Sequence, residues 1–275
     1  MQKIKTLSAL VFVLLSTLTS YAMDTVGGVN SIVDSYGHTR LHIAAQKGDV
    51  TAAKKLIESG ADVNLTDNNG ETPLHLAACK NVECVELLIH AGSDINKVDV
   101  IWGWTPLHWA VALGKPDCLK ALIAAGADIN KQASEKCNGY TPLCLAASVH
   151  NWQSVENKKS VEILISAGAQ ITKTDLNGNP PLYAAITNMH YEIAQILIER
   201  YLESALEIPL NNYSLPELNK LLDIANKIKI KRLERLMLAI EQFIQKIITQ
   251  ISNQSSTRSK SVLLNLNQQN PTQRS

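Results

Sequence analysis

Three histidines at regular spacing are the first residues of this sequence that suggest chemistry. His42, His75 and His108 follow one another at intervals of 33 residues. Histidine is a common zinc ligand, with bonds of about 2.1 Å. Each of these histidines, however, stands in its own copy of a repeated helical segment, and packed helices lie about 10 Å apart. The spacing therefore excludes a shared zinc ion, and we expect a structural role and no metal site.

The cysteines give little sign of redox chemistry. Cys84 and Cys118 each precede a helix-ending glycine by eight residues, so they occupy equivalent positions in the core. Such positions lie too far apart for a disulfide, which requires Cα atoms within about 7 Å. A Cys79–Cys84 bond is conceivable, but buried thiols commonly fill cores. Cys144 takes the place of a repeated histidine, and Cys137, in a long loop, is expected to be the most exposed thiol.

The sequence also lacks the signatures of common enzymes. We find no Gly-x-Ser-x-Gly, His-Glu-x-x-His or Cys-x-x-Cys motif and no glycine-rich phosphate loop. The 26 basic and 25 acidic side chains balance, which argues against nucleic-acid binding through a basic face. With 45% apolar but only 5% aromatic residues, the core must consist of Ala, Leu, Ile and Val. We expect no catalytic activity and no cofactor.

The first 22 residues resemble a targeting signal. Lys3 and Lys5 precede a largely apolar run at 7–18, and the small residues Ser20 and Ala22 follow at the two positions that a signal peptidase reads. This order is typical of a secretory signal peptide. We expect cleavage after Ala22 and export to the periplasm or the medium; a buried N-terminal helix or an uncleaved anchor is the alternative. No later apolar run is long enough to span a bilayer.

The positioning elements come from a segment that repeats along the chain. A Thr-Pro-Leu-His motif and, further on, a Gly-Ala-Asp-Val-Asn motif recur together. Threonine caps a helix and proline suits its first turn, whereas glycine ends a helix in a left-handed conformation. The copies of the first motif begin at Thr39, Thr72, Thr105, Thr141 and, in degenerate form, Pro180.

These paired motifs resemble ankyrin repeats. Five copies cover residues 34–201, most of the predicted mature chain, at about 34–66, 67–98, 99–132, 133–174 and 175–201. The resemblance implies an all-α solenoid of helix-turn-helix units with projecting hairpin loops, in which one copy cannot bury its apolar face alone. The fourth copy has an insertion at 151–159 and a lengthened hairpin at 132–138, which we expect to bulge from the stack. The fifth copy, with Tyr201 at the glycine position, is degenerate.

The flanking segments differ from the repeats. Residues 23–33 lead into the array. Apolar residues at helical spacing predict one or two amphipathic helices within 202–251, which we expect to cap the stack. A basic cluster at 227–235 is interpreted as a solvated helix face, with an acidic or membrane partner as the alternative. Residues 252–275 are rich in Ser, Asn and Gln and are predicted to be disordered.

Unusual apolar residues mark a candidate binding surface. In the family, partners usually bind the concave face formed by hairpin tips and first helices. The third hairpin tip, 100–104, reads Val-Ile-Trp-Gly-Trp, where the second is polar. Trp109 aligns with core positions. The alternative is that the long fourth hairpin folds over the tryptophans. The predicted partner-binding strip consists of Ile101, Trp102, Trp104, Leu113, Tyr140 and Val149.

The resulting hypothesis is a non-catalytic, exported protein-interaction scaffold that binds a protein partner through the concave face of repeats three and four. Trp and Tyr are enriched among residues that dominate binding energy. The resemblance extends to small exported bacterial ankyrin proteins, some of which act on host targets. Two alternatives remain: a periplasmic accessory protein that supports another enzyme or protects against stress, and an enzyme. We expect a monomer that binds no nucleic acid and whose mature chain does not span a membrane.

Overall fold

The computed structural model describes residues 28–148, 154–204, 208, 210–227, 238 and 240–249. The predicted signal peptide (1–22) and tail (252–275) lie outside these ranges, as do Val149 and most of the basic cluster. The chain divides into two compact units at Asn177/Gly178, and each is described by itself. Among the described residues, no helix combines the length and the apolar character needed to cross a membrane.

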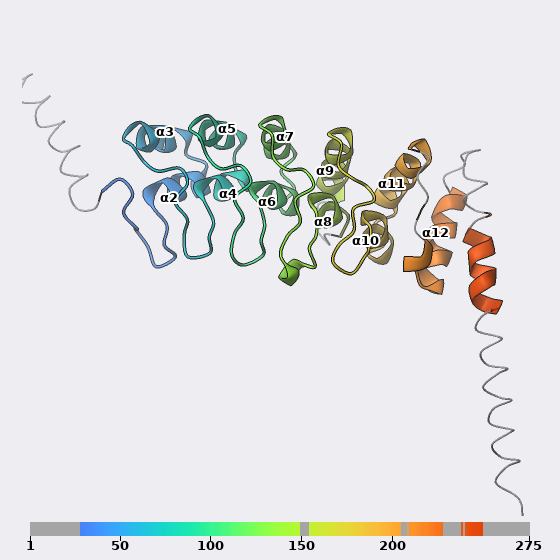
Figure 1. Ribbon diagram of the computed structural model, residues 1–275. Helices are drawn as coiled ribbons and strands as arrows, with labels where there is room; N and C mark the ends of the chain where they lie inside the picture. Colours follow the sequence, from blue (N-terminus) through green and yellow to red (C-terminus); the bar gives the residue numbers. More distant parts are fainter. Residues whose placement is uncertain are drawn as a thin grey trace, which may run out of the picture. The chain divides into compact units, whose positions relative to one another are not determined.

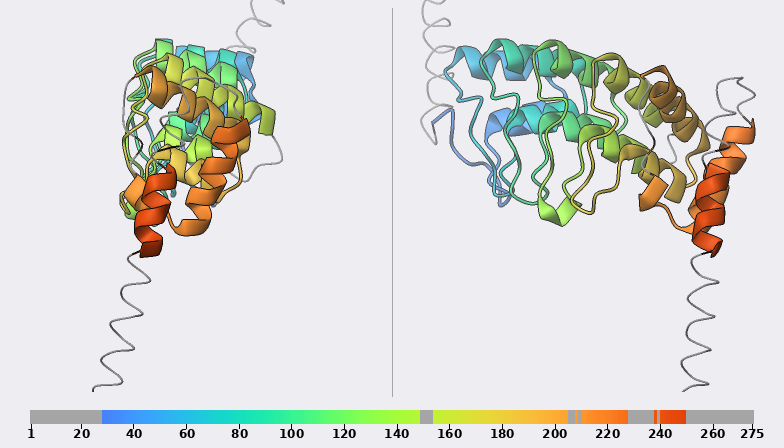
Figure 2. Two further views of the ribbon diagram at one scale, coloured as in Figure 1. Left: turned by 90° about the vertical axis from the view of Figure 1, so that its right-hand side faces the viewer. Right: turned by 45° about the vertical axis from the view of Figure 1, so that its right-hand side comes forward.

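The first unit is a stack of helix pairs, as predicted. The first helices form one row and the second helices a parallel row, and the hairpins project on the side away from the second helices (Figures 1 and 2). The pairs are α2 (Arg40–Lys47) with α3 (Val50–Glu58), α4 (Pro73–Ala78) with α5 (Val82–His90), α6 (Pro106–Ala112) with α7 (Pro116–Ala124), and α8 (Pro142–Ser148) with α9 (Ser154–Ser166).

Local sequence sets where these helices begin and end. Thr39, Thr72 and Thr105 cap α2, α4 and α6 in an extended conformation. At the end of α7, Gly126 takes φ +90°, and the amide of the next residue bonds back to Leu122. Alanines and leucines fill the space between neighbouring helices, and Leu74, Leu107 and their equivalents are fully buried. Small and branched side chains thus allow the close spacing that stacking requires.

The repeated histidines tie one repeat to the next, which confirms their structural role. The backbone N–H of Thr39, Thr72 or Thr105 donates to Nδ1 of the histidine three residues later. Nδ1 is therefore an acceptor, and the proton sits on Nε2. Nε2 of His42, His75 and His108 donates to a backbone carbonyl of the following repeat, at a distance of 3.1 Å in each case. In the fourth repeat the Cys144 thiol donates to the Lys173 carbonyl over 3.6 Å.

Two further ladders run along the first unit. On one side, asparagine side chains accept the backbone N–H of the loop in the next repeat: Asn30 from Asp62, Asn64 from Asp94, Asn96 from Asp128 and Asn130 from Gln170. On the other side, neighbouring hairpin tips share backbone hydrogen bonds, such as Ser134 N to Trp102 O at 2.9 Å. Asn30 belongs to the lead-in segment at 23–33, so this segment provides the first asparagine contact of the series.

The fourth repeat departs from the prediction of a bulging insertion. From Ser154 to Lys159 the inserted residues are helical and lengthen α9 to 13 residues, against nine in α3, α5 and α7. Asn157 is buried there, and Ser160 Oγ donates to the Glu156 carbonyl. The long hairpin contains a 3₁₀ turn, η1 (Glu135–Cys137), which ends in Asn138 at φ 51°.

The second unit contains the degenerate fifth repeat and the helices after it. It comprises α10 (Pro181–Thr187), α11 (Tyr191–Glu203), η2 (Leu210–Asn212) and α12 (Leu215–Lys227), and residues 240–249 are also helical. Tyr201 stands where earlier repeats have glycine, so α11 does not stop there, and the side chain is fully buried. α12 packs on α10 and α11.

The tip glycines provide a test of the hairpin ladder. A Cβ at Gly103 (φ +67°) would lie 2.6 Å from the backbone N of Ser134, whereas one at Gly126 (φ +90°) would meet nothing within 4 Å. We expect Gly126→Ala to lower the free energy of unfolding by about 1 kcal/mol through φ alone. Gly103→Ala should cost about 1–3 kcal/mol more, because it also displaces the neighbouring tip. Urea unfolding checks both, and equal losses would contradict the crowding.

The buried histidines predict acid sensitivity. Burial lowers the pKa of His75 and His108 to about 4. Above the unfolded pKa of about 6.5, both states hold neutral imidazole. Between pH 6.5 and 4 only the unfolded state takes up the proton, so stability present above pH 6.5 is lost as the pH falls.

His108→Gln should therefore be less stable than the native protein at neutral pH but lose about 3 kcal/mol less between about pH 8 and pH 4. Titrating groups common to both proteins cancel in this comparison. Denaturant unfolding of both proteins over a pH series measures the difference. If the free energy of unfolding of His108→Gln changed with pH as steeply as that of the native protein, burial would not lower the pKa of His108 in the folded state.

Candidate functional site

One position in each repeat presents a side chain beside the hairpin and the first helix. It is the residue before the capping position, held by His38, Glu71, Trp104 and Tyr140 in the first unit. The repeated histidines bond to the carbonyls of the last three and so fix the backbone there. The scaffold thus uses the main chain of this row, and the histidine contacts do not involve its side chains. These four residues are called the pre-cap row below.

Aromatic side chains gather at the third repeat. The Trp104 ring lies 5.3 Å from Trp109, edge to face, and 6.5 Å from His108, nearly parallel. Trp102 lies 6.1 Å from Trp104 on the outer side. Aromatic pairs at these distances add about 0.5–1.5 kcal/mol each beyond the area they bury. The cluster is therefore held firmly against α6 rather than swinging in solvent.

A buried carboxylate positions this cluster. Asp99 accepts the backbone N–H of Trp102 (2.7 Å) and of Gly103 (3.0 Å) at Oδ1. Its Oδ2 accepts the Trp109 indole N–H at 2.9 Å. Asp99 therefore fixes the hairpin tip and one tryptophan ring with the same side chain. The sequence analysis assigned Trp109 to the core, whereas the structure places it half-buried on α6, four residues before Leu113.

The predicted strip is only partly assembled in the described residues. Trp102 and Leu113 are 41% and 38% exposed, whereas Ile101, Trp104 and Tyr140 are half-buried. Val149 lies outside the described residues. The long fourth hairpin contacts Trp102 through Ser134, whose Oγ donates to the Trp102 carbonyl at 2.7 Å, but it does not cover the Trp102 ring. One of the two hairpin tryptophans thus stays accessible.

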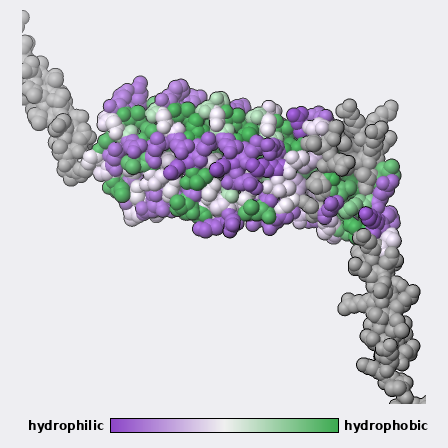
Figure 3. Space-filling view, in the orientation of Figure 1, coloured by the Kyte–Doolittle hydropathy of each residue, from purple (hydrophilic) through white to green (hydrophobic). Residues whose placement is uncertain are grey.

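Other hairpin tips also expose apolar side chains. Tyr36, Val100 and Leu176 are each more than half exposed at the tips of the first, third and fifth hairpins. In Figure 3, green apolar patches interrupt the hydrophilic surface along the lower edge, where the hairpins end. The second tip is polar, with Asn68 and Asn69. Apolar side chains are therefore exposed at the third hairpin, where Val100 and Trp102 stand two residues apart, and also at the first, where Ile32 and Val33 join Tyr36.

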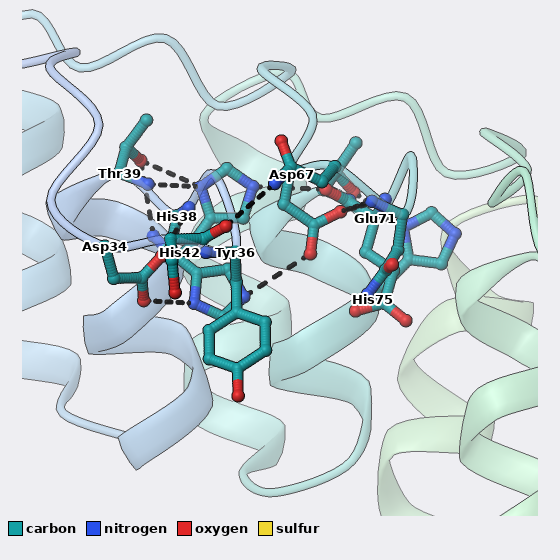
Figure 4. Close-up of polar contacts among 12 residues, drawn as sticks. Asp34, Tyr36, His38, Thr39, His42, Asp67, Glu71 and His75 are labelled. Atoms are coloured by element: carbon teal, nitrogen blue, oxygen red, sulfur yellow. Dashed lines mark hydrogen bonds and ion pairs between the residues drawn. The ribbon is translucent and has the colours of Figure 1, made fainter.

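A polar cluster occupies the other end of the pre-cap row. His38 lies between two carboxylates, with Nδ1 2.8 Å from Asp34 Oδ2 and Nε2 3.3 Å from Asp67 Oδ2 (Figure 4). Its ring stacks on Tyr36 and on His42, at 5.7 and 5.8 Å. Burial raises the pKa of Asp34, but its hydrogen bonds from His38 and Tyr36 outweigh this effect and lower it. His38 thus has one ring nitrogen facing each of the two neighbouring aspartates.

Glu71 lies between the polar and the aromatic parts of the row. Its backbone is held by Asp67 Oδ1, which accepts its N–H at 2.8 Å, and by His42, which donates to its carbonyl. The residue as a whole is 9% exposed. Burial raises the pKa of Glu71 to about 7, and the charges of Asp67 and Asp99 act in the same direction. Glu71 could not be identified from the sequence, because its burial depends on the adjacent repeats.

The remaining reactive groups do not form a site. Within the described ranges, no group of three or more His, Cys, Asp or Glu side chains could hold a metal ion. All five cysteines are free thiols, Cys79 and Cys84 included. Burial raises the pKa of each, to about 12 for Cys79 and about 11 for Cys118, and so disfavours the reactive thiolate form. Cys137 is half-buried beside Trp104 rather than freely exposed.

Comparison with known proteins supports this architecture. The family profile described as "Ankyrin repeats (3 copies)" matches residues 10–99, 41–133, 91–175 and 131–212. Together these matches cover most of the chain. The overlapping windows are what a tandem array produces when a three-repeat profile is moved along it.

Relatives of known sequence fall into two groups. The "Putative ankyrin repeat protein YahD" of Escherichia coli is 31% identical over 187 residues, which are 57% of this chain and 92% of YahD. The "E3 ubiquitin-protein ligase KEG" of Arabidopsis thaliana is 29% identical over 170 residues, 59% of this chain but 10% of the ligase. The "ANK repeat-containing protein nipk-1" of Caenorhabditis elegans is 29% identical over 201 residues, 66% of this chain and 33% of its own length. The chain thus spans a third or less of these two longer relatives.

Proposed function

Since the chain belongs to the ankyrin-repeat family, whose repeats serve as protein-interaction scaffolds, we propose that it binds a protein partner through the third and fourth repeats. The observation that carries the proposal is the accessible Trp102 ring, set against the fixed Trp104 and Trp109 at a hairpin tip. The family is generally non-catalytic, and we propose no reaction for this chain.

The physical support is preorganisation. Asp99 and the tip-to-tip hydrogen bonds hold the third hairpin before any partner arrives. A surface ordered in advance loses little conformational entropy when it binds, so more of the contact energy appears as affinity. A tryptophan that is partly exposed and backed by other rings is the kind of residue that dominates binding energy. Leu113, Ile101 and Tyr140 would extend the contact.

The proposal includes export. Residues 1–22 combine a basic N-terminal region, an apolar run and small residues at the expected cleavage site, which supports secretion from a bacterial cell. The relative YahD is bacterial. The proposed partner is then an external protein, such as a host protein. A periplasmic accessory role, in support of another enzyme or against stress, is the second candidate and rests on the same signal. Whether the protein remains in the periplasm separates the two.

Replacement of Trp102 tests the binding surface. Trp104 is unsuitable, because its loss would remove three ring contacts at once. We expect Trp102→Ala to abolish or reduce about 30-fold the capture of a partner first identified by pull-down and mass spectrometry, since such anchors contribute about 2 kcal/mol or more. The melting temperature should change little. Lys54→Ala, exposed on α3, is the control, and undiminished capture by Trp102→Ala would rule out this surface.

Cell fractionation tests export. In the cells that produce the protein, the mature chain should begin at Met23 and accumulate in the medium, because the signal is removed on translocation. Immunodetection in cytoplasmic, periplasmic and extracellular fractions, with N-terminal sequencing, measures this. Quantitative retention in the periplasm would favour the accessory role, and an intact N-terminus in the cytoplasm would contradict both.

A further inference from the structure

Three buried carboxylates lie close together on the first-helix face of the first unit. Asp67, Glu71 and Asp99 are 6%, 9% and 3% exposed. The two aspartates are used by the fold. Asp67 Oδ1 accepts two backbone N–H groups and Oδ2 faces His38, and Asp99 accepts three donors through both oxygens. They hold the second and third hairpins in shape.

Glu71 differs, because its carboxylate makes no hydrogen bond or ion pair within the described part of the chain. A carboxylate that is partly desolvated in this way is costly unless it is paired. The charges that act on it are Asp67 and Asp99, which oppose its ionisation, and His38, which favours it. The thiol of Cys79 on α4 also lies within its electrostatic reach. His38 is already placed between Asp34 and Asp67, so Glu71 receives no direct cation.

The neighbour of Glu71 along the pre-cap row is aromatic. Trp104 occupies the same position one repeat later, and His75, on the helix that follows Glu71, donates to its carbonyl at 3.1 Å. The two hairpins are also joined by Val100 N to Asn69 O at 2.8 Å. The row therefore places Glu71 and the half-buried Trp104 at equivalent positions of adjacent repeats on the same face, and the Trp104 ring is held by Trp109 and His108. A ring face and a carboxylate together attract a cation that is partly desolvated.

We propose that Glu71 and Trp104 form a recognition site for one positively charged side chain of the protein partner. This inference rests on the proposed function and specifies the chemistry of the partner. The cation would supply the counter-charge that Glu71 lacks and would lie against the indole. An arginine fits both groups, because its planar guanidinium stacks on aromatic rings and donates to a carboxylate. Trp102 would contact apolar atoms of the same partner segment.

The site carries its own pH dependence. With the pKa of Glu71 raised to about 7, a cation must shift this group to its ionised form on binding. Binding should therefore strengthen as the pH rises from 6 to 8 and weaken as Glu71 takes up its proton. Asp67, Asp99, Asp34 and His38 face the same region, so the test compares the native protein with a variant that changes Glu71 alone.

The test uses N-acetyl-arginine amide as the probe and the indole N–H signals of the ¹⁵N-labelled full chain as the readout. At about 50 mM probe and pH 8, we expect a saturable shift of the Trp104 signal and little shift with the neutral isostere N-acetyl-citrulline amide. Glu71→Gln should weaken the arginine response about tenfold, as loss of a charge-assisted contact predicts. Glu83→Gln, exposed on α5, is the matched control and should respond like the native protein.

Three outcomes would overturn the proposal: no Trp104 shift at this concentration, equal shifts with arginine and citrulline amides, or an undiminished response in Glu71→Gln. If Glu71→Gln folds poorly, Glu71→Ala takes its place and should likewise weaken the arginine response about tenfold. The experiment contains no partner protein. A negative result with the arginine probe therefore does not affect the proposal that Trp102 binds a protein partner. Conversely, if Trp102→Ala captured the partner as well as the native protein, the proposed function would fail even though the chain bound the arginine probe.

Discussion

The first unit depends on a buried imidazole that stays neutral. In three successive repeats the histidine accepts a backbone N–H of its own repeat at Nδ1 and donates to a carbonyl of the next repeat from Nε2. Only the Nε2 tautomer satisfies both partners, and a second proton would face a donor. Because the contact joins backbone to backbone, it fixes the spacing of the repeats whatever side chains stand around it. The two flanking ladders then hold the loops on either side of this line.

This arrangement explains why the pre-cap row can vary. The histidines use only the carbonyl oxygens of Glu71, Trp104 and Tyr140, so the scaffold places no demand on their side chains. Four different residue types stand at this position in the first unit, from histidine to tyrosine. The neighbouring motif positions, by contrast, are nearly constant, since their side chains cap helices or fill the core. Variation is therefore concentrated at positions whose side chains the histidine contacts do not use.

The periodic features could be predicted from the sequence because they are local. Threonine caps, helix-ending glycines and repeated leucines each act within a few residues, and the helix pairs lie where these motifs place them. Trp109 and Glu71 could not be interpreted in this way. In the second hairpin Asp67 precedes the capping threonine by five residues, whereas in the third hairpin Asp99 precedes it by six. The third hairpin also has a hydrogen bond from the Trp109 indole to Asp99, which has no counterpart in the second. Likewise, the 151–159 insertion was expected to form a loop, but its residues from Ser154 to Lys159 are helical and belong to α9.

The locations of these failures are themselves informative. A chain selected only for stacking would place a neutral residue at position 71, since a buried carboxylate with a pKa of about 7 opposes folding at neutral pH. It would also have no need for three of its four tryptophans within eight residues, in a protein with only 5% aromatic residues. Both departures fall in adjacent repeats, on the same face and beside backbone that the histidine contacts hold rigid. Local conflicts with the requirements of folding are expected where a sequence serves another purpose. Because a charge conflict and an aromatic excess occur together here, a partner that offers both a cation and an apolar surface would relieve both at once.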